Sequence, residues 1–236
     1  MIKFVFSIFY FARKTFGDAK QIIWKNHPIK GIYIYFDMLS RRNFPLTSSE
    51  GSIPHIFTWY LQWSGKVQNF DSLCHDVKEI NKCEVEHTSV IPLSSPIPSL
   101  TRMSNVIGFM LWGCLVIFLA LIDLMRGHWW HALLFNESCK AKATSIADHV
   151  ELAKDYLFPN SEWIYRPLWT YEAEIRGSRT LFYFYSTNVE GFKQAGKYLP
   201  AYFGWKTSSW GNYLVWDHYQ EDFVNRFLQK RANISV

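Results

Sequence analysis

Residues 180–186 have the sequence Thr-Leu-Phe-Tyr-Phe-Tyr-Ser, and this stretch decides the fold class. Its consecutive apolar side chains would cover both faces of a β-strand, which is typical of a central strand in a parallel sheet. Residues 213–216, Tyr-Leu-Val-Trp, repeat the pattern, and residues 31–36, Gly-Ile-Tyr-Ile-Tyr-Phe, predict a third strand that ends at Asp37. The sequence therefore predicts a sheet that is buried on both faces.

Helical patterns lie between these strands. Pro167 begins a helix that Gly177 ends, and apolar residues four apart predict a last helix after residue 217. Helices are also expected over residues 52–65, from 71 onward through His75 and Asp76, over 106–125 and over 129–141, with a strand over 84–91. This alternation predicts an α/β fold, a Rossmann-like parallel sheet with helices on both faces, in a single domain over residues 1–236. The Pro- and Ser-rich residues 92–100 predict a loop within it.

The composition excludes several classes of protein. The chain of 236 residues is 49% hydrophobic and 19% charged, which fits a globular protein rather than a disordered one. Its formal net charge of +5 is spread along the chain in short basic clusters, so we expect no nucleic-acid partner. The four cysteines lack the spacing of a zinc site or a disulfide scaffold. The 18% aromatic content fits a dense aromatic core or a surface on which sugars stack.

Two apolar stretches bear on membrane contact. Residues 4–12 are not expected to form a secretory signal, because Arg13 and Lys14 follow directly where a cleavage site would need small residues. Residues 106–122 carry no charge, but as a helix they would span about 25 Å, less than the ~30 Å hydrocarbon core of a bilayer. A buried core helix is the preferred interpretation, and a membrane-embedded or interfacial helix is the alternative.

Polar residues follow the expected strands at the edge where open α/β sheets bind ligands. They are Asp37, Ser186, Thr187, Asn188, Asp217 and His218. Such residues also end strands and cap helices in many proteins, so capping is the competing interpretation. We expect the last five of them to contribute to a substrate-binding cleft.

A second candidate site lies in a loop rich in small hydroxyl groups. The side chains of Thr47, Ser48 and Ser49 suit phosphate or sugar hydroxyl groups, and Glu50 is placed to act as a general base. The alternative is an N-cap loop whose acidic residue stabilises the helix dipole. The chain has no GxGxxG, Walker, HExxH, GxSxG or DxD sequence, so we predict neither a cofactor nor a metal site.

Two groups of residues resemble a known family. Residues 44–51, Phe-Pro-Leu-Thr-Ser-Ser-Glu-Gly, resemble the signature of the polysaccharide biosynthesis PFTS motif proteins, with Leu46 in place of the Phe that names the motif. Residues 165–174, 182–188 and 213–220 resemble the strand–helix pattern of surface-polysaccharide glycosyltransferases with two facing Rossmann-like domains. The resemblance covers most of residues 40–225.

The resemblance implies transfer of an activated sugar during capsule or O-antigen-type synthesis, in the cytoplasm or at the cytoplasmic face of the membrane. In enzymes of this GT-B-like architecture the N-terminal domain contacts the acceptor, and the C-terminal domain binds the donor nucleotide. The 236 residues match an acceptor-side domain alone, so a truncated enzyme is expected. Its partners would then be a glycan or lipid-linked acceptor and a separate donor-binding polypeptide that carries the nucleotide-sugar site.

Two other interpretations stay open. The chain is either a non-catalytic carbohydrate-binding or scaffold protein of a polysaccharide assembly complex, or a membrane-anchored protein through residues 106–122. Peripheral contact with the membrane is compatible with all three interpretations. The sequence alone leaves open whether the chain is active as an enzyme.

Overall fold

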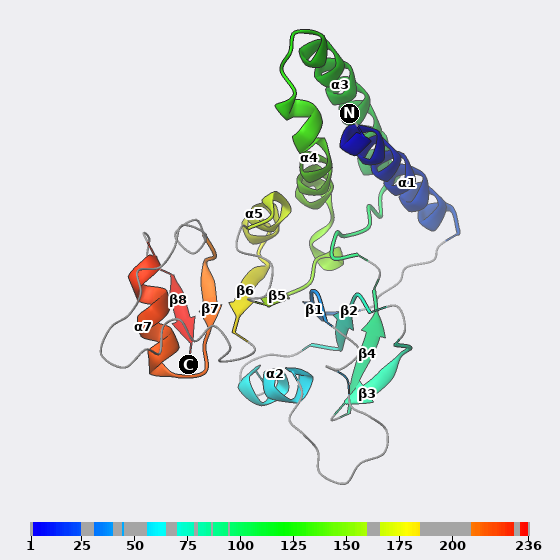
Figure 1. Ribbon diagram of the computed structural model, residues 1–236. Helices are drawn as coiled ribbons and strands as arrows, with labels where there is room; N and C mark the ends of the chain where they lie inside the picture. The colour runs from blue at the N-terminus through cyan, green and yellow to red at the C-terminus, as the bar shows by residue number, and fades with distance from the viewer. Residues whose placement is uncertain are drawn as a thin grey trace. The chain divides into compact units, whose positions relative to one another are not determined.

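The computed structural model describes residues 2–24, 31–39, 44, 56–64, 70–77, 80–85, 87–93, 95–159, 166–184, 209–228 and 232–235 (Figure 1). The chain divides into two compact units, each built from separate segments. The helical unit contains residues 1–30, 97–152 and 167–177, and the sheet unit contains residues 31–96, 153–166 and 178–236. The boundary between Pro96 and Ile97 falls within the Pro- and Ser-rich stretch. The single domain expected over residues 1–236 stays a prediction.

The sheet unit is built on eight strands in the order β3-β4-β2-β1-β5-β6-β7-β8. All neighbouring strands are parallel except β3, which pairs antiparallel with β4. The strands are β1 (Tyr33–Phe36), β2 (Ser72–His75), β3 (Cys83–Val85), β4 (Thr88–Pro92), β5 (Asp155–Pro159), β6 (Arg179–Tyr183), β7 (Asn212–Leu214) and β8 (Asn233–Ser235). The α/β, Rossmann-like fold predicted from the sequence is confirmed.

The chain reverses its direction across the sheet between β1 and β5. From β1 it adds β2 and β4 on one side, then returns to place β5, β6 and β7 on the other. Strands β4-β2-β1-β5-β6-β7 thus reproduce the Rossmann order 3-2-1-4-5-6. Sheets of this kind bind ligands beyond the carboxyl ends of the strands at such a switch point. The order therefore directs attention to the residues that follow β1 and β5.

Each face of the sheet is covered by a helix of the same unit. The face that carries Phe36 packs against α2 (Ile56–Ser64), where the rings of Phe36 and Phe57 lie 5.0 Å apart at 72°. The opposite face carries Phe182 and continues to Phe184, which contacts Phe223 of α7 (His218–Phe227). The side chains of β1, β2, β5 and most of β6 are buried on both faces, as parallel strands require.

The helical unit consists of α1 (Ile2–Trp24), α3 (Met103–Met125), α4 (Trp130–Ile146), the short 3-10 helix η2 (His149–Glu151) and α5 (Leu168–Ile175). Helices α1, α3 and α4 lie side by side (Figure 1) and share an aromatic core. Phe11 contacts both Phe109 of α3 and Phe135 of α4, with ring centroids 5.2 and 6.0 Å apart. Phe135 also contacts Phe4, at 5.7 Å.

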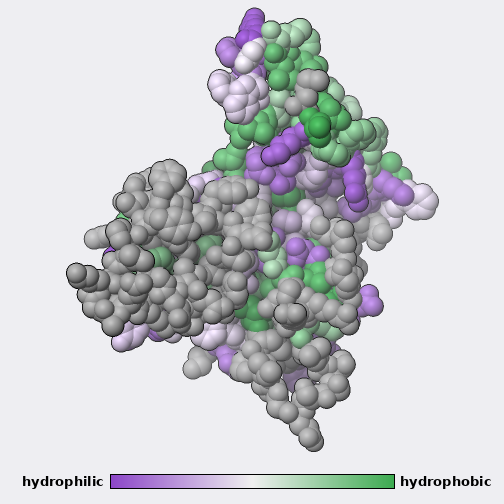
Figure 2. All heavy atoms as spheres, viewed as in Figure 1, coloured by the Kyte–Doolittle hydropathy of each residue, from purple (hydrophilic) through white to green (hydrophobic). Residues whose placement is uncertain are grey.

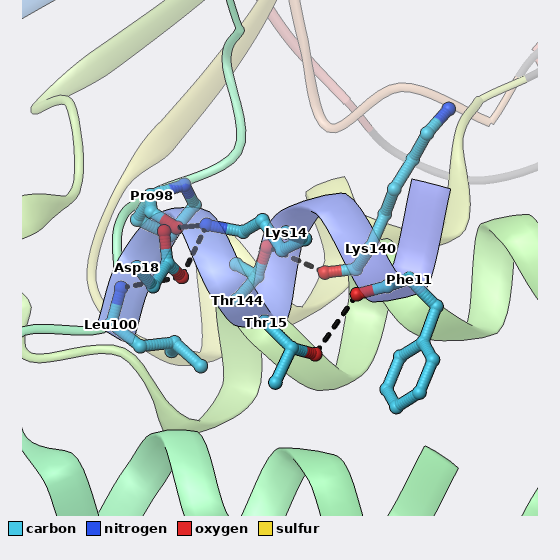
Figure 3. Close-up of polar contacts among 8 residues, drawn as sticks. All are labelled: Phe11, Lys14, Thr15, Asp18, Pro98, Leu100, Lys140 and Thr144. Atoms are coloured by element: carbon cyan, nitrogen blue, oxygen red, sulfur yellow. Dashed lines mark hydrogen bonds and ion pairs between the residues drawn. The ribbon is translucent and has the colours of Figure 1, made fainter. Parts of the chain in front are cut away.

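Polar contacts hold one end of α1 (Figure 3). The Lys14 ammonium donates hydrogen bonds to the Asp18 carboxylate at 2.8 Å and to the Pro98 carbonyl at 2.7 Å. The Leu100 backbone N–H donates to the same Asp18 oxygen at 3.0 Å. These bonds fix the C-terminal half of α1 to the segment that leads into α3, so that α1 and α3 run antiparallel.

Gly113 of α3 lies where Phe11 of α1 approaches most closely, and we predict opposite effects for two glycine substitutions in this helix. A Cβ at Gly113 would lie 2.1 Å from the Phe11 ring, whereas a Cβ at Gly108 would contact nothing. Gly113→Ala is expected to destabilise the helical unit by about 1–3 kcal/mol, because Phe11 is enclosed by other aromatic rings. Gly108→Ala should stabilise it by about 0.5–1 kcal/mol, since alanine favours the helix.

Thermal unfolding of both variants beside the original chain measures this difference. Because the two substitutions add the same methyl group to the same helix, their comparison separates helix propensity from packing. Equal effects of the two substitutions would show that Phe11 does not pack against α3.

Three sequence-based expectations are wrong. Residues 72–75 form a strand rather than a helix start, because pairing with β1 and β4 outweighs the helical spacing of Leu73 and Val77. Residues 84–85 belong to β3 and residues 88–91 to β4, so the single strand expected over 84–91 is two strands, with His87 at a φ of 65° before the second. Residues 106–122 are not a buried core helix, since only 22% of the most apolar window of α3 is buried.

Candidate active site at the carboxyl edge of the sheet

A buried carboxylate follows β1 at the switch point. Asp37 is 7% exposed, and its backbone N–H donates to the Leu157 carbonyl of β5 at 2.9 Å, so the pairing of β1 with β5 extends to this residue. The next residue, Met38, has a φ of 54° and turns the chain away from the sheet. The sheet therefore holds Asp37 at the edge where β1 and β5 end.

A second carboxylate lies beside it. Phe36 is in register with His75, so Asp37 and Asp76 occupy equivalent positions on neighbouring strands, which lie about 4.8 Å apart. Backbone groups of Met38, Leu39 and Asp76 itself hydrogen-bond the Asp76 carboxylate, yet burial raises the pKa of this group. Its Oδ1 is buried and has no hydrogen-bond partner among the residues that the structure describes. A carboxylate with a raised pKa and an unused oxygen is suited to proton transfer.

His75 is fully buried on the face covered by α2. Its Nδ1 accepts a hydrogen bond from the Val77 backbone N–H at 3.1 Å, and its ring lies edge-on to Phe44 at 4.6 Å. Burial lowers the pKa of His75 to about 4, so the imidazole is neutral near pH 7 and its proton is on Nε2. In the described part of the chain this Nε2 has no partner, which leaves a buried donor at the end of β2.

The far end of the same edge is aromatic. Trp216 follows β7, and its indole N–H donates to the Phe184 carbonyl, which fixes the ring while 55% of the residue stays exposed. Trp59 of α2 lies nearly parallel to it, with an interplanar angle of 7° and ring centroids 6.4 Å apart. His218 and Tyr219 are also exposed and lie with their rings 4.0 Å apart. An immobilised, exposed indole is the kind of surface on which a sugar ring stacks.

The sequence matches a family over its second half. Residues 112–236 match the family described as polysaccharide biosynthesis PFTS motif protein. The chain belongs to this family. No curated protein and no solved structure shows a significant match to the chain. The suspected family is thus confirmed, and the chain has a role in polysaccharide biosynthesis.

In this PFTS motif protein the matched residues include β6, β7 and α7, and with them Trp216 at the carboxyl edge of the sheet. Residues 165–220, which resembled surface-polysaccharide enzymes, lie within the match. Residues 44–51, which resemble the motif itself, lie outside it.

Two of the expected site residues lie in the described part of this PFTS motif protein. Asp217 caps α7, and its Oδ1 accepts a hydrogen bond from the Gln220 backbone N–H at 2.9 Å. His218 is exposed beside Tyr219. The other expected site residues lie outside the described residues: Thr47, Ser48, Ser49, Glu50, Ser186, Thr187 and Asn188.

Sequence reasoning placed two members of the site in the wrong element. Asp76 was not expected at a strand end, because the residues before it have helical spacing and were not recognised as β2. Trp216 was expected inside a strand, but β7 ends at Leu214. In the described parts of the chain no three His, Cys, Asp or Glu residues lie close enough together to hold a metal ion.

Proposed function

We propose that the sheet unit is the acceptor-side domain of a GT-B-like glycosyltransferase that acts in capsule or O-antigen-type synthesis. The observation that carries the proposal is Trp216, an indole that a backbone hydrogen bond immobilises while more than half of it stays exposed at the ligand-binding edge of a Rossmann-like sheet. The family's role in polysaccharide biosynthesis makes a glycan the ligand that fits this surface best.

The reaction transfers a sugar from a nucleotide-activated donor to a hydroxyl group of the acceptor. The acceptor oxygen forms a bond to the anomeric carbon, the bond from that carbon to the phosphate oxygen breaks, and the hydroxyl proton passes to a base. Asp76 is suited to the role of base because burial raises its pKa. Glu50 stays a second candidate for this role. A separate polypeptide that carries the nucleotide-sugar site would supply the donor.

Replacing Trp216 by Ala is expected to weaken glycan binding by roughly 5-fold, because stacking on an aromatic ring contributes about 1 kcal/mol. The chain would first be screened on an array of bacterial surface oligosaccharides, and the strongest ligand would then be titrated calorimetrically against both proteins. Tyr171→Ala is the matched control, since it removes an exposed aromatic side chain from the helical unit.

The outcomes separate the proposal from its alternatives. Glycan binding that Trp216→Ala weakens and Tyr171→Ala does not would support it. Thermal stabilisation by a nucleotide-sugar alone would show that the donor site is on this chain, and would contradict the acceptor-side assignment. Binding of neither ligand class would contradict the function itself.

A further inference from the structure

Helix α1 of the helical unit buries polar side chains and exposes apolar ones. Its buried positions include three polar residues, Ser7, Thr15 and Asp18, while Phe6, Phe9, Phe16, Ile23 and Trp24 are among its exposed ones. In a helix that faces water the apolar stripe is directed toward the core and the polar face toward solvent. Phe4 and Phe11, on the buried face of α1, contact aromatic rings of the neighbouring helices. The unit therefore packs without the exposed apolar side chains of α1.

Helix α3 continues this apolar surface. Its exposed side chains include Ile107, Leu111, Leu115, Phe118 and Met125, of which Leu111 is 62% and Phe118 60% exposed. Figure 2 shows apolar residues, in green, over much of the region formed by these helices. Large contiguous apolar patches on proteins mark surfaces that bind another phase or partner. We refer to the exposed faces of α1 and α3 as the α1–α3 surface.

The charged residues of the helical unit indicate what binds to the α1–α3 surface. Among the described residues of this unit, every Lys, Arg, Asp or Glu that is exposed rather than partly buried is basic: Lys3, Arg13, Lys20, Arg102 and Arg126. The acidic residues of these helices are instead at least partly buried, and several form ion pairs. Those pairs are Asp18 with Lys14, Asp123 with His131, Glu137 with Lys140, and Asp148 with Arg102.

The structure assigns the α1–α3 surface to an anionic lipid bilayer, with both helices lying along the interface. Helices that lie in a membrane interface combine Phe, Leu and Trp side chains, which enter the lipid, with Lys and Arg side chains, which contact anionic headgroups. Trp129 and Trp130, both exposed at the turn between α3 and α4, suit the boundary between lipid headgroups and acyl chains. This assignment does not rest on the proposed sugar transfer.

Among the helices in the described part of the chain, α3 alone is long and apolar enough to cross a bilayer. Its neighbour α4 argues against that orientation. Helix α4 packs against α3 and carries Glu137 and Lys140 halfway along its own length. A crossing orientation would draw this ion pair toward the hydrocarbon, which is unfavourable.

Cys114 allows a direct test, because it is an exposed thiol on α3, whereas Cys74 and Cys139 are buried. The full chain would carry Cys83→Ser and an environment-sensitive fluorophore on Cys114. We expect its emission to shift to the blue on addition of vesicles of phosphatidylcholine and phosphatidylglycerol. Doxyl groups placed near the headgroups should quench it more than groups near the bilayer centre. Stronger quenching by the deep groups would overturn the interfacial orientation.

Vesicle flotation tests the two parts of the surface separately. The triple substitution of Lys3, Arg13 and Lys20 by Gln should weaken partitioning onto the anionic vesicles on the order of 100-fold, since each basic residue near such a surface contributes about 1 kcal/mol. Leu111→Ser with Phe118→Ser should also reduce flotation. The matched control is Val150→Ser with Ile175→Ser, which removes two exposed apolar side chains from elsewhere in the unit.

Two results would overturn the assignment. The first is a failure of the flotation test, either because the original chain does not bind the anionic vesicles or because the surface and control variants float equally. The second is a stable dimer in lipid-free solution that shields the Cys114 fluorophore from aqueous quenchers, because a second copy of the chain would then cover this surface.

Discussion

Replacing Asp155 by Ala is expected to lower the free energy of unfolding of the sheet unit by about 2–3 kcal/mol, because the substitution removes the acceptor of a buried tyrosine hydroxyl and breaks an ion pair whose arginine side chain is 42% exposed. Asp155 is fully buried at the start of β5. Its two carboxylate oxygens accept hydrogen bonds from Arg179 Nε at 2.8 Å and Nη2 at 2.6 Å, and Tyr60 Oη donates to Oδ2 at 2.6 Å. The substitution leaves the Tyr60 hydroxyl and part of the Arg179 guanidinium without their acceptor.

Chemical unfolding would measure this effect, with Asp222→Ala as the control because Asp222 is an exposed carboxylate on α7. The double substitution of Asp155 by Leu and Arg179 by Met should cost less than Asp155→Ala, since an apolar pair leaves no charge behind. A loss below about 1 kcal/mol for Asp155→Ala would show that solvent reaches the pair and screens it.

The position of this ion pair explains why such a substitution tests stability rather than function. Asp155 and Arg179 are cross-strand neighbours at the amino ends of β5 and β6. The candidate active site lies at the carboxyl ends of the strands, at the opposite edge of the same sheet. The fold thus separates a hydrogen-bonded network that joins two strands and α2 from the edge that is left for a ligand.

The sequence predicted those elements whose own residues determine their conformation. Strands β1 and β6 have consecutive apolar residues, and α5 begins after Pro167 and ends before Gly177, whose φ is 97°. Elements that depend on distant partners were missed. Strand β2 has helical spacing, and it is a strand because β1 and β4 pair with it on either side. Strand β5 is five residues long and has no local signal that separates it from a loop.

The sequence predicted a polar site at the strand ends, but it identified only some of the residues of that site. Polar residues at strand ends, such as Asp37, could be placed at one edge because parallel strands end together. The switch point beside Asp37 depends on the strand order, which no local pattern contains. The exposure of α3 likewise could not be predicted from the sequence, because a wholly apolar helix has the same sequence whether protein or lipid surrounds it.

The stability of the sheet unit should fall by up to about 3 kcal/mol as the pH is lowered from about 6.5 to about 4, because of His75 alone. Burial lowers the pKa of this imidazole to about 4 in the folded chain, against about 6.5 in the unfolded chain. Within this window the unfolded state takes up a proton that the folded state does not, so acid favours unfolding. Above the window both states are neutral and the effect disappears.

The measurement is denaturant unfolding across this pH range for the original chain and for His75→Asn. Asparagine keeps an acceptor for the Val77 backbone N–H but does not titrate, so its stability should decline less with acid. His87→Asn is the matched control, because His87 is exposed and its positive φ suits asparagine. If His75→Asn and the original chain lost stability in parallel, His75 would have an ordinary pKa. Solvent would then reach the imidazole under α2, and the buried position of this ring beside Phe44 would be wrong.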